Sequence, residues 1–188
     1  MAAVSLKGLS ERRTSIVGVT SSDLEPRQLT ADELLDGWQA AWSGKDPTAF
    51  AAVCTPDVHY EDPLTDEPLE GPAALGAHAA RLWSGFPDAR LETLGPRVID
   101  GSLASAPAKL VATHREPLEG LPATNRFLVV PVVFYCELSG PTNLRIARVR
   151  AFFDLYDAGV QLGVLPGRGT FGGKALLMLR GFGLRTGR

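Results

Sequence analysis

Val58–Gly71 has the sequence VHYEDPLTDEPLEG, and this stretch decides the fold expected for the chain. Its side chains alternate as in a β-strand, so Val58, Tyr60 and Asp62 share one face. That face is the more apolar one, which predicts that Asp62 points toward the interior or its rim. Pro63 has no backbone N–H to donate to a sheet, so the strand is expected to stop there.

Helical patterns lie on both sides of this strand. Before it, Thr30 and Glu33 form a capping-box pair ahead of apolar residues that recur at helical spacing up to Gly44. A second short helix begins at Asp46, and a third is expected to begin near Pro72. From about residue 88 the pattern changes to strands separated by Gly, Pro and Asn turns. The sequence therefore predicts an α+β fold, with a curved, mostly antiparallel sheet packed on three N-terminal helices.

The composition is that of an ordinary soluble domain. The chain has 188 residues, of which 45% are apolar and 21% are charged, so one domain with short extensions is expected. The net charge of −2 gives no argument for a nucleic-acid partner. Cys54 and Cys136 lie among apolar neighbours, which indicates reduced core residues rather than a disulfide framework. Because neither a membrane helix nor a signal peptide is recognisable, we expect a cytoplasmic protein.

The two ends of the chain differ from its middle. Residues 1–28 show no sustained periodicity and are interpreted as a flexible N-terminal extension. Residues 166–188 form a basic tail whose segment KALLMLRGF could be a short helix. We expect this tail to be solvated or to dock on its own domain, with a membrane-surface or partner helix as the weaker alternative. The central domain is expected to span residues 29–165.

Common catalytic and metal-binding motifs are missing from the sequence. It contains no glycine-rich phosphate loop, HExxH, CxxC or GxSxG motif. His59, His78 and His114 are isolated from one another and from both cysteines in sequence. We therefore expect neither a metal site nor a cofactor.

The order of these segments resembles the nuclear transport factor two-like superfamily, in particular its SnoaL-like and ketosteroid isomerase-like branch. The resemblance covers about residues 30–165. It rests on the helices that lead into TPDVHYEDPLTDEPLEGPAAL, on RVRAFFDLYD in the last strand and on the closing AGVQLGVLP. It implies a cone, also called a cystatin-like fold, in which a bent sheet wraps around helices and encloses an apolar pocket. Because the open face of such sheets usually needs a cover, a homodimer is expected.

The resemblance places Asp62 on the position of the isomerases' general base, which moves a proton between carbons that flank a carbonyl. An apolar pocket raises the basicity of a carboxylate for this chemistry. The family's oxyanion tyrosine falls near Trp38, whose indole can donate one hydrogen bond. The partner acid falls near Pro131, which has no donor. Since losing one oxyanion donor costs about 10²–10³ in rate, efficient steroid isomerisation is not expected.

Asp154 and His114 are the other candidates for catalysis. Asp154 corresponds to a late-strand aspartate of the SnoaL-like cyclases, but alternation puts it on one face with Arg148 and Arg150. That arrangement favours an ion pair with a depressed pKa over a proton shuttle. His114 shares its strand face with apolar residues such as Leu110, which favours a core histidine, although an imidazole would suit acid–base work.

Aromatic side chains complete the expected pocket. The residues expected to bind the substrate are Trp38, Tyr60, Trp83 and Phe152, because flat walls suit a ring-shaped ligand. His78 lies one position away from the apolar stripe of the third helix and is interpreted as structural. For Asp62 an alternative stays open, in which it only ends the strand and bonds to loop amides.

Two functions therefore remain. The first is a cofactor-independent proton-transfer enzyme of the isomerase or cyclase type, acting on a small hydrophobic carbonyl compound such as a polyketide or steroid-like ring. The second is a non-catalytic module of the same fold that binds a hydrophobic ligand or dimerises. The inward carboxylate of Asp62 favours the enzyme, whereas the altered oxyanion positions favour the binding protein. The fold alone does not decide between them.

Overall fold

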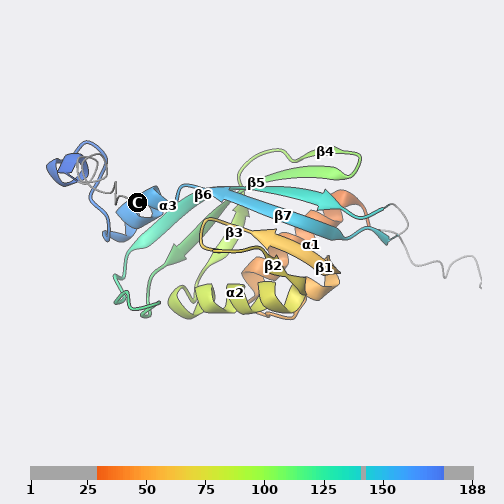
Figure 1. The fold of residues 1–188 in the computed structure, drawn as a ribbon, viewed down its shortest axis with the longest axis horizontal. Coiled ribbons are helices and arrows are strands. Elements are labelled where there is room, and N and C mark those ends of the chain that lie inside the picture. The colour runs from red at the N-terminus through yellow and green to blue at the C-terminus, as the bar shows by residue number, and fades with distance from the viewer. Residues whose placement is uncertain (1–28, 141–142, 176–188) are drawn as a thin grey trace, which may run out of the picture.

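The computed structural model describes residues 29–140 and 143–175. The described helices are α1 (Ala31–Gly44), the short 3-10 helix η2 (Ala49–Ala52), α2 (Gly71–Gly85) and α3 (Leu155–Leu162). The strands are β1 (Cys54–Glu61), β2 (Leu69–Glu70), β3 (Arg90–Thr93), β4 (Val98–Asp100), β5 (Leu103–Thr113), β6 (Phe127–Leu138) and β7 (Ile146–Phe153). Figure 1 shows that α1 and α2 cover one face of the sheet and that α3 lies at one end of it.

All strands belong to one sheet with the order β2-β1-β7-β6-β5-β3, and β4 pairs with β5. The β1–β7 pair is parallel, and the other pairs are antiparallel. The predicted α+β fold, with a curved, mostly antiparallel sheet on helices, is confirmed. The strand that leads to Asp62, β1, lies between the two-residue edge strand β2 and its parallel partner β7.

Local signals set the helix that begins the domain. Thr30 accepts a hydrogen bond from the backbone N–H of Glu33 (3.2 Å), and the Glu33 carboxylate accepts one from the N–H of Thr30 (2.9 Å). This reciprocal bonding satisfies two of the free amides at the helix start. The apolar stripe of α1 is buried and comprises Leu34, Leu35, Trp38, Ala41 and Trp42.

Helix α2 depends on a glycine for its close approach to the preceding chain. A Cβ atom at Gly76 would collide with the carbonyl oxygen of Pro47. This contact brings α2 against the segment around η2, and α2 also packs on β1. The closeness of α2 to β1 matters because both contribute to the site described below.

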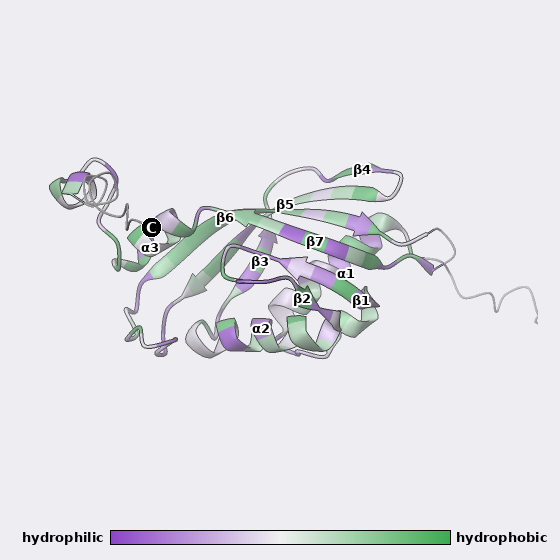
Figure 2. Cartoon of the chain, in the orientation of Figure 1, coloured by the Kyte–Doolittle hydropathy of each residue, from purple (hydrophilic) through white to green (hydrophobic). Residues whose placement is uncertain are grey.

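An aromatic cluster fills the space between α1 and the sheet. Trp38 lies at its centre, with ring centroids 5.6–6.1 Å from those of Trp42, Phe50, Tyr60 and Phe134. Edge-to-face and tilted pairs at these distances stabilise a core beyond the area they bury. Figure 2 shows that β6 is hydrophobic along much of its length, whereas hydrophilic residues interrupt β7.

The end of the last strand differs from the sequence-based expectation. The segment RVRAFFDLYD was expected in the last strand, but β7 ends at Phe153 and α3 begins at Leu155. Asp154 ends the strand because its side chain accepts a hydrogen bond from the backbone N–H of Asp157 (2.9 Å) and caps the helix.

The expected N-terminal extension lies outside the described residues, and so does most of the segment KALLMLRGF in the basic tail. Within residues 29–140 and 143–175, no helix combines the length and the apolarity needed to cross a membrane.

Candidate functional site

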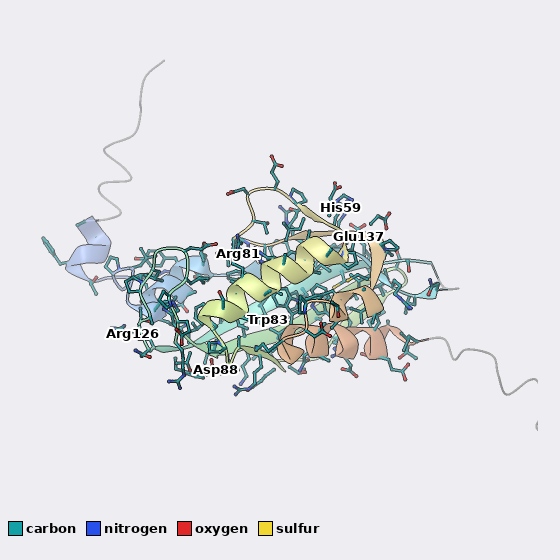
Figure 3. The ribbon with its side chains drawn as sticks, turned by 90° about the horizontal axis from the view of Figure 1, so that it is seen from below. His59, Arg81, Trp83, Asp88, Arg126 and Glu137 are labelled. Carbon is teal, nitrogen blue, oxygen red and sulfur yellow. The ribbon has the colours of Figure 1, made fainter. Side chains whose placement is uncertain are left out.

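A cavity of about 200 Å³ lies between the helix-covered face of the sheet and α1, α2 and α3. Its walls are aliphatic and aromatic, and among them are Trp42, Trp83, Phe86, Val130, Phe134 and Phe153. Figure 3 shows α2 lying across the sheet, with Trp83 on the side of α1. Tyr60 and Asp62 also line the cavity, and Asp62 carries the one carboxylate in the described lining.

The side chain of Asp62 is buried and is held by three hydrogen-bond donors. Its side chain is 2% exposed. The hydroxyl of Tyr60 donates to Oδ2 (2.9 Å), and the backbone N–H of Leu64 donates to Oδ1 (2.8 Å). The Nε2 atom of His78 lies 2.9 Å from Oδ2. The carboxylate is therefore anchored from its own strand, from the following turn and from α2.

The contacts of His78 fix where its proton lies. Its Nδ1 atom is 3.1 Å from Nη2 of Arg81, and a guanidinium can only donate a hydrogen bond. Nδ1 accepts in this contact, and Nε2 donates its proton to Asp62. Arg81 in turn pairs with Glu119 (Nε–Oε1, 3.2 Å). His78 thus acts as a donor that points at Asp62, and Arg81 holds the ring in that orientation.

These contacts keep Asp62 ionised. Burial by itself raises the pKa of the Asp62 carboxyl, but the hydrogen bond and the charge interaction with His78 outweigh it together with the hydrogen bonds from Leu64 and Tyr60, and the pKa lies below its ordinary value. The pKa of Tyr60 is well above its ordinary value because the hydroxyl is buried next to the Asp62 charge. Tyr60 therefore remains a protonated donor.

The two carboxylate oxygens differ in their remaining capacity. Each oxygen has two acceptor positions, and both positions of Oδ2 are taken by Tyr60 and His78. Oδ1 accepts one bond, from Leu64, and keeps one free position. Asp62 also lines a surface groove with Thr65 and Arg150, so it stands between the apolar cavity and the outside.

The structure separates the four residues expected to bind a substrate. Tyr60 and Trp83 line the cavity. Trp38 is buried behind the lining, packed against Trp42 and Tyr60. Phe152 lies on the opposite, exposed face of β7, and Phe153 occupies the lining instead.

Neither of the other two catalytic candidates lies in the described lining. His114 is fully buried behind Phe86 (ring centroids 5.0 Å apart), and its Nδ1 accepts the backbone N–H of Thr124 (3.2 Å). Asp154 caps α3 and pairs with Arg168 (2.5 Å), so it lies apart from Asp62. The hydrogen bond from the Asp157 N–H and the pairing with Arg168 lower the pKa of Asp154. The expected ion pair therefore involves the tail residue Arg168 rather than a strand arginine.

His78 is the residue that the sequence interpretation left out of the site. A usable signal was present, because position 78 follows Leu75 by three residues and precedes Leu82 by four. Those spacings put all three side chains on one helix face. What the sequence does not contain is the distance between this face and Asp62.

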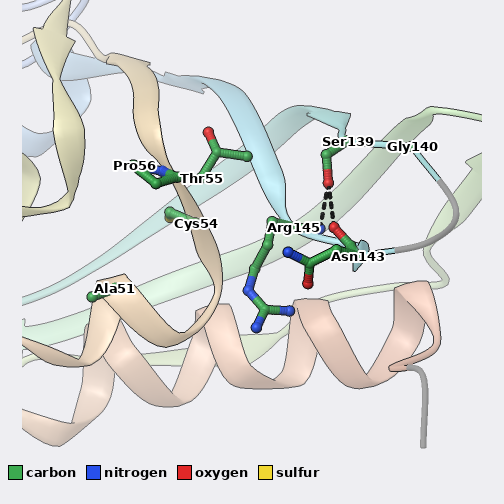
Figure 4. Close-up of a pocket in the computed structure, with 8 residues that line it drawn as sticks. All are labelled: Ala51, Cys54, Thr55, Pro56, Ser139, Gly140, Asn143 and Arg145. Atoms are coloured by element: carbon green, nitrogen blue, oxygen red, sulfur yellow. Dashed lines mark hydrogen bonds between the residues drawn. The ribbon is translucent and has the colours of Figure 1, made fainter. Parts of the chain in front are cut away.

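A second, open pocket lies at the end of the sheet where β6 and β7 are connected (Figure 4). Ser139 donates a hydrogen bond to the carbonyl of Asn143 and accepts one from the N–H of Arg145, both at 2.8 Å. None of the candidate residues lines this pocket. No group of three or more metal-binding side chains occurs in the described part of the chain.

The chain is similar to known proteins both in sequence and in structure. The family model described as SnoaL-like domain matches residues 35–149. No curated protein matches the chain. A solved structure of TsrD from Streptomyces laurentii is similar at a TM-score of 0.63 and 22% identity, covering 75% of this chain and 100% of TsrD. The structure of IdmH from Streptomyces antibioticus, a candidate polyketide cyclase, is similar at a TM-score of 0.61 and 19% identity, covering 70% of this chain and 97% of IdmH.

A candidate polyketide cyclase from Pseudomonas putida KT2440 is 28% identical, with a TM-score of 0.59 and coverage of 71% of this chain and 98% of that protein. These structures share the fold described above over nearly their whole lengths.

Proposed function

This chain belongs to the SnoaL-like domain family, and from that premise we propose that it is a cofactor-independent proton-transfer enzyme of the isomerase or cyclase type. The substrate would be a small hydrophobic carbonyl compound. One observation carries the proposal: an ionised carboxylate, Asp62, lies in the wall of a cavity whose other walls are almost entirely apolar.

The proposed step uses the free acceptor position of Asp62. Oδ1 takes a proton from the carbon next to the substrate carbonyl, and the electron pair of the broken C–H bond forms the C=C bond of an enolate. The carbonyl π electrons move to the oxygen. In an isomerisation, Asp62 then returns the proton to another carbon. In a cyclisation, the enolate carbon bonds to the carbon of a second carbonyl, the π electrons of that carbonyl move to its oxygen, and this oxygen takes the proton from Asp62. His78 and Tyr60 are positioning residues that hold Oδ2 while Oδ1 reacts.

The size of the cavity supports a compact substrate. An apolar cavity of about 150 Å³ holds one benzene ring, and drug-sized ligands occupy roughly 300–1,000 Å³. At about 200 Å³, this cavity fits one or two small rings or a short folded chain. A polyketide-derived ring therefore fits the proposal better than a four-ring steroid.

The low pKa of Asp62 favours a substrate whose C–H bond is unusually acidic. A carboxylate stabilised by three hydrogen bonds is a weaker base than one desolvated without partners. Its substrate must then have a more acidic C–H, such as one between two carbonyls or between a carbonyl and an aromatic ring. Polyketides contain the first arrangement at every second carbon.

Deuterium exchange tests this function. The probe is 2-tetralone, a two-ring ketone with a C–H between its carbonyl and its aromatic ring, in D₂O with the uncatalysed rate subtracted. We expect wild type to accelerate exchange and Asp62→Asn to lose that acceleration. Asp57→Asn is the matched control, because Asp57 is an exposed aspartate of β1, the strand that leads to Asp62. Equal exchange by wild type and Asp62→Asn would refute Asp62 as the base.

A non-catalytic binding protein is the second candidate. The resemblance placed the second acid of the isomerases near Pro131, which has no donor and is exposed on the outer face. Its neighbours Val130 and Val132 line the cavity instead. An apolar wall at this position favours a protein that only binds its ligand. A protein of this kind would bind 2-tetralone without accelerating its exchange.

We also propose a homodimer formed through the outer face of the sheet. This face presents Val133, Tyr135 and Phe152 to solvent, and Arg148 and Glu137 pair on it (3.8 Å). Sedimentation velocity would test the proposal, with Tyr135→Glu expected to convert a dimer to a monomer. A monomeric wild type at micromolar concentration would exclude it.

A further inference from the structure

Four buried polar side-chain atoms have no hydrogen-bond partner within residues 29–140 and 143–175. They are Nε1 of Trp38, Nε1 of Trp42, Oγ1 of Thr55 and Nε2 of His114. A buried donor without a partner destabilises a protein and calls for an explanation. Of the four, Trp42 alone lines the cavity that contains Asp62.

The indole of Trp42 lies next to the side chains that hold Asp62. Its ring centroid is 5.8 Å from that of Tyr60 and 6.4 Å from that of His78. The backbone carbonyl of Trp42 accepts a hydrogen bond from Nε1 of Trp83 (3.1 Å), which ties α1 to α2 at this point. A ligand in the cavity can therefore contact Trp42 and Asp62 at the same time.

We propose that the cavity binds an uncharged ring compound whose carbonyl oxygen accepts a hydrogen bond from Nε1 of Trp42, while its acidic C–H faces Oδ1 of Asp62. This inference rests on the proposed function and specifies its substrate class. The indole N–H can only donate, so it selects an acceptor atom in the ligand.

The charge of the site selects further among ligands. Asp62 is ionised and buried, so a carboxylate or phosphate ligand in the cavity would face a like charge in a medium of low dielectric constant. The remaining walls offer apolar contact. A neutral ketone with one or two rings satisfies the free donor without bringing a second negative charge next to Asp62.

Trp42 would also supply an oxyanion donor inside the cavity, whereas Trp38, where the resemblance placed this donor, does not line the cavity. As the enolate forms, negative charge grows on the oxygen bonded to the indole N–H, and the bond strengthens in the transition state. The donor lies one helical turn beyond the position at which the family's tyrosine was expected.

The test compares two ligands of the same shape. Binding of 2-tetralone and of tetralin, the hydrocarbon that lacks its oxygen, is measured by ligand-observed NMR. In Trp42→Phe we expect 2-tetralone to bind about tenfold more weakly and tetralin to change less than about twofold. Trp38→Phe is the matched control, because it removes an unpartnered buried indole that does not line the cavity.

A second variant separates the hydrogen bond from the packing. Incorporating 3-benzothienylalanine at position 42 replaces the N–H with sulfur and keeps the two-ring shape. The same selective loss of 2-tetralone binding supports the inference. Equal weakening of both ligands, or no change for either, overturns it, as does a wild-type protein that binds neither.

Failure of the proposed function gives a different pattern. If Asp62 is not a base, Trp42→Phe still weakens ketone binding, but wild type and Asp62→Asn exchange deuterium at the same rate. If only the inference about Trp42 fails, Asp62→Asn still abolishes exchange while the two ligands respond equally to Trp42→Phe.

Discussion

His78→Phe removes both ring nitrogens, Nε2 next to Asp62 and Nδ1 next to Arg81, and keeps a flat ring in contact with Trp42 and Tyr60. The main loss is the hydrogen bond from Nε2 to Oδ2 of Asp62, 2.9 Å long between side chains that are 3% and 2% exposed. Hydrogen bonds to charged groups contribute about 1.5–3 kcal/mol. Because the contact with half-exposed Arg81 adds little, we expect the free energy of unfolding to fall by about 2–3 kcal/mol at neutral pH.

This loss should depend on pH in a defined direction. The pKa of Asp62 is lower in the folded chain than its ordinary value of 3.8. Its ionised form therefore stabilises the fold above that value, and the stabilisation is lost as pH falls through the folded-state pKa. Removing His78 takes away one cause of the low pKa. The difference in the free energy of unfolding between wild type and His78→Phe should be largest at pH 6–7 and should shrink as pH falls below about 4.

Urea unfolding at several pH values measures this difference, and thermal unfolding should show a fall of roughly 5–10 °C in Tm at neutral pH. His59→Phe is the control, because His59 is 41% exposed and lies 4.0 Å from Glu70. We expect this control to change stability by less than about 0.5 kcal/mol. A loss below about 0.5 kcal/mol in His78→Phe, or a loss that is the same at pH 3 and pH 7, would refute the Asp62–His78 pairing.

Three further predictions follow from the packing. Gly76→Ala should lower the free energy of unfolding by about 1–3 kcal/mol, measured in urea, because the new methyl group meets the carbonyl of Pro47. Ala158→Phe should abolish 2-tetralone binding measured by NMR while leaving the fold intact, because the added ring fills the cavity that Ala158 lines. Cys54 and Cys136 should resist iodoacetamide at pH 8 in the folded protein, measured by mass spectrometry, because burial raises the pKa of each thiol to about 12.

Each of these predictions has a comparison that could contradict it. Gly44→Ala should be nearly neutral, because a Cβ atom there meets nothing within 4 Å. Ala77→Phe lies on the exposed side of α2 and should leave ligand binding unchanged. Alkylation of either cysteine at the same rate in folded and urea-unfolded protein would contradict the third prediction.

Local spacing explains why part of the structure could be predicted from the sequence. The capping box at Thr30 and Glu33 depends on residues three positions apart, and it is confirmed. The inward direction of Tyr60 follows from alternation within one strand, and Tyr60 is buried. Asp62 continues that direction although β1 ends one residue before it.

Distances across the fold explain what was missed. Asp62 and His78 are brought together because α2 packs on β1, and no pattern in either segment specifies that contact. Phe152 lies outside the described lining of the cavity for a different reason, since it shares its face of β7 with Arg148 and Arg150. The alternation of side chains along β7 therefore places Phe152 on the outer face and Phe153 on the cavity side.

The parallel pairing of β1 with β7 has a consequence for how the protein is made. Tyr60 pairs with Leu69 of β2 on one side and with Val149 of β7 on the other, so one edge of β1 finds its partner only after most of the domain has left the ribosome. Contacts between such distant segments slow folding, and until they form, this edge of β1 is open to pairing with other chains. The cavity beside Asp62 should therefore close only after Phe153, which lines it, has emerged.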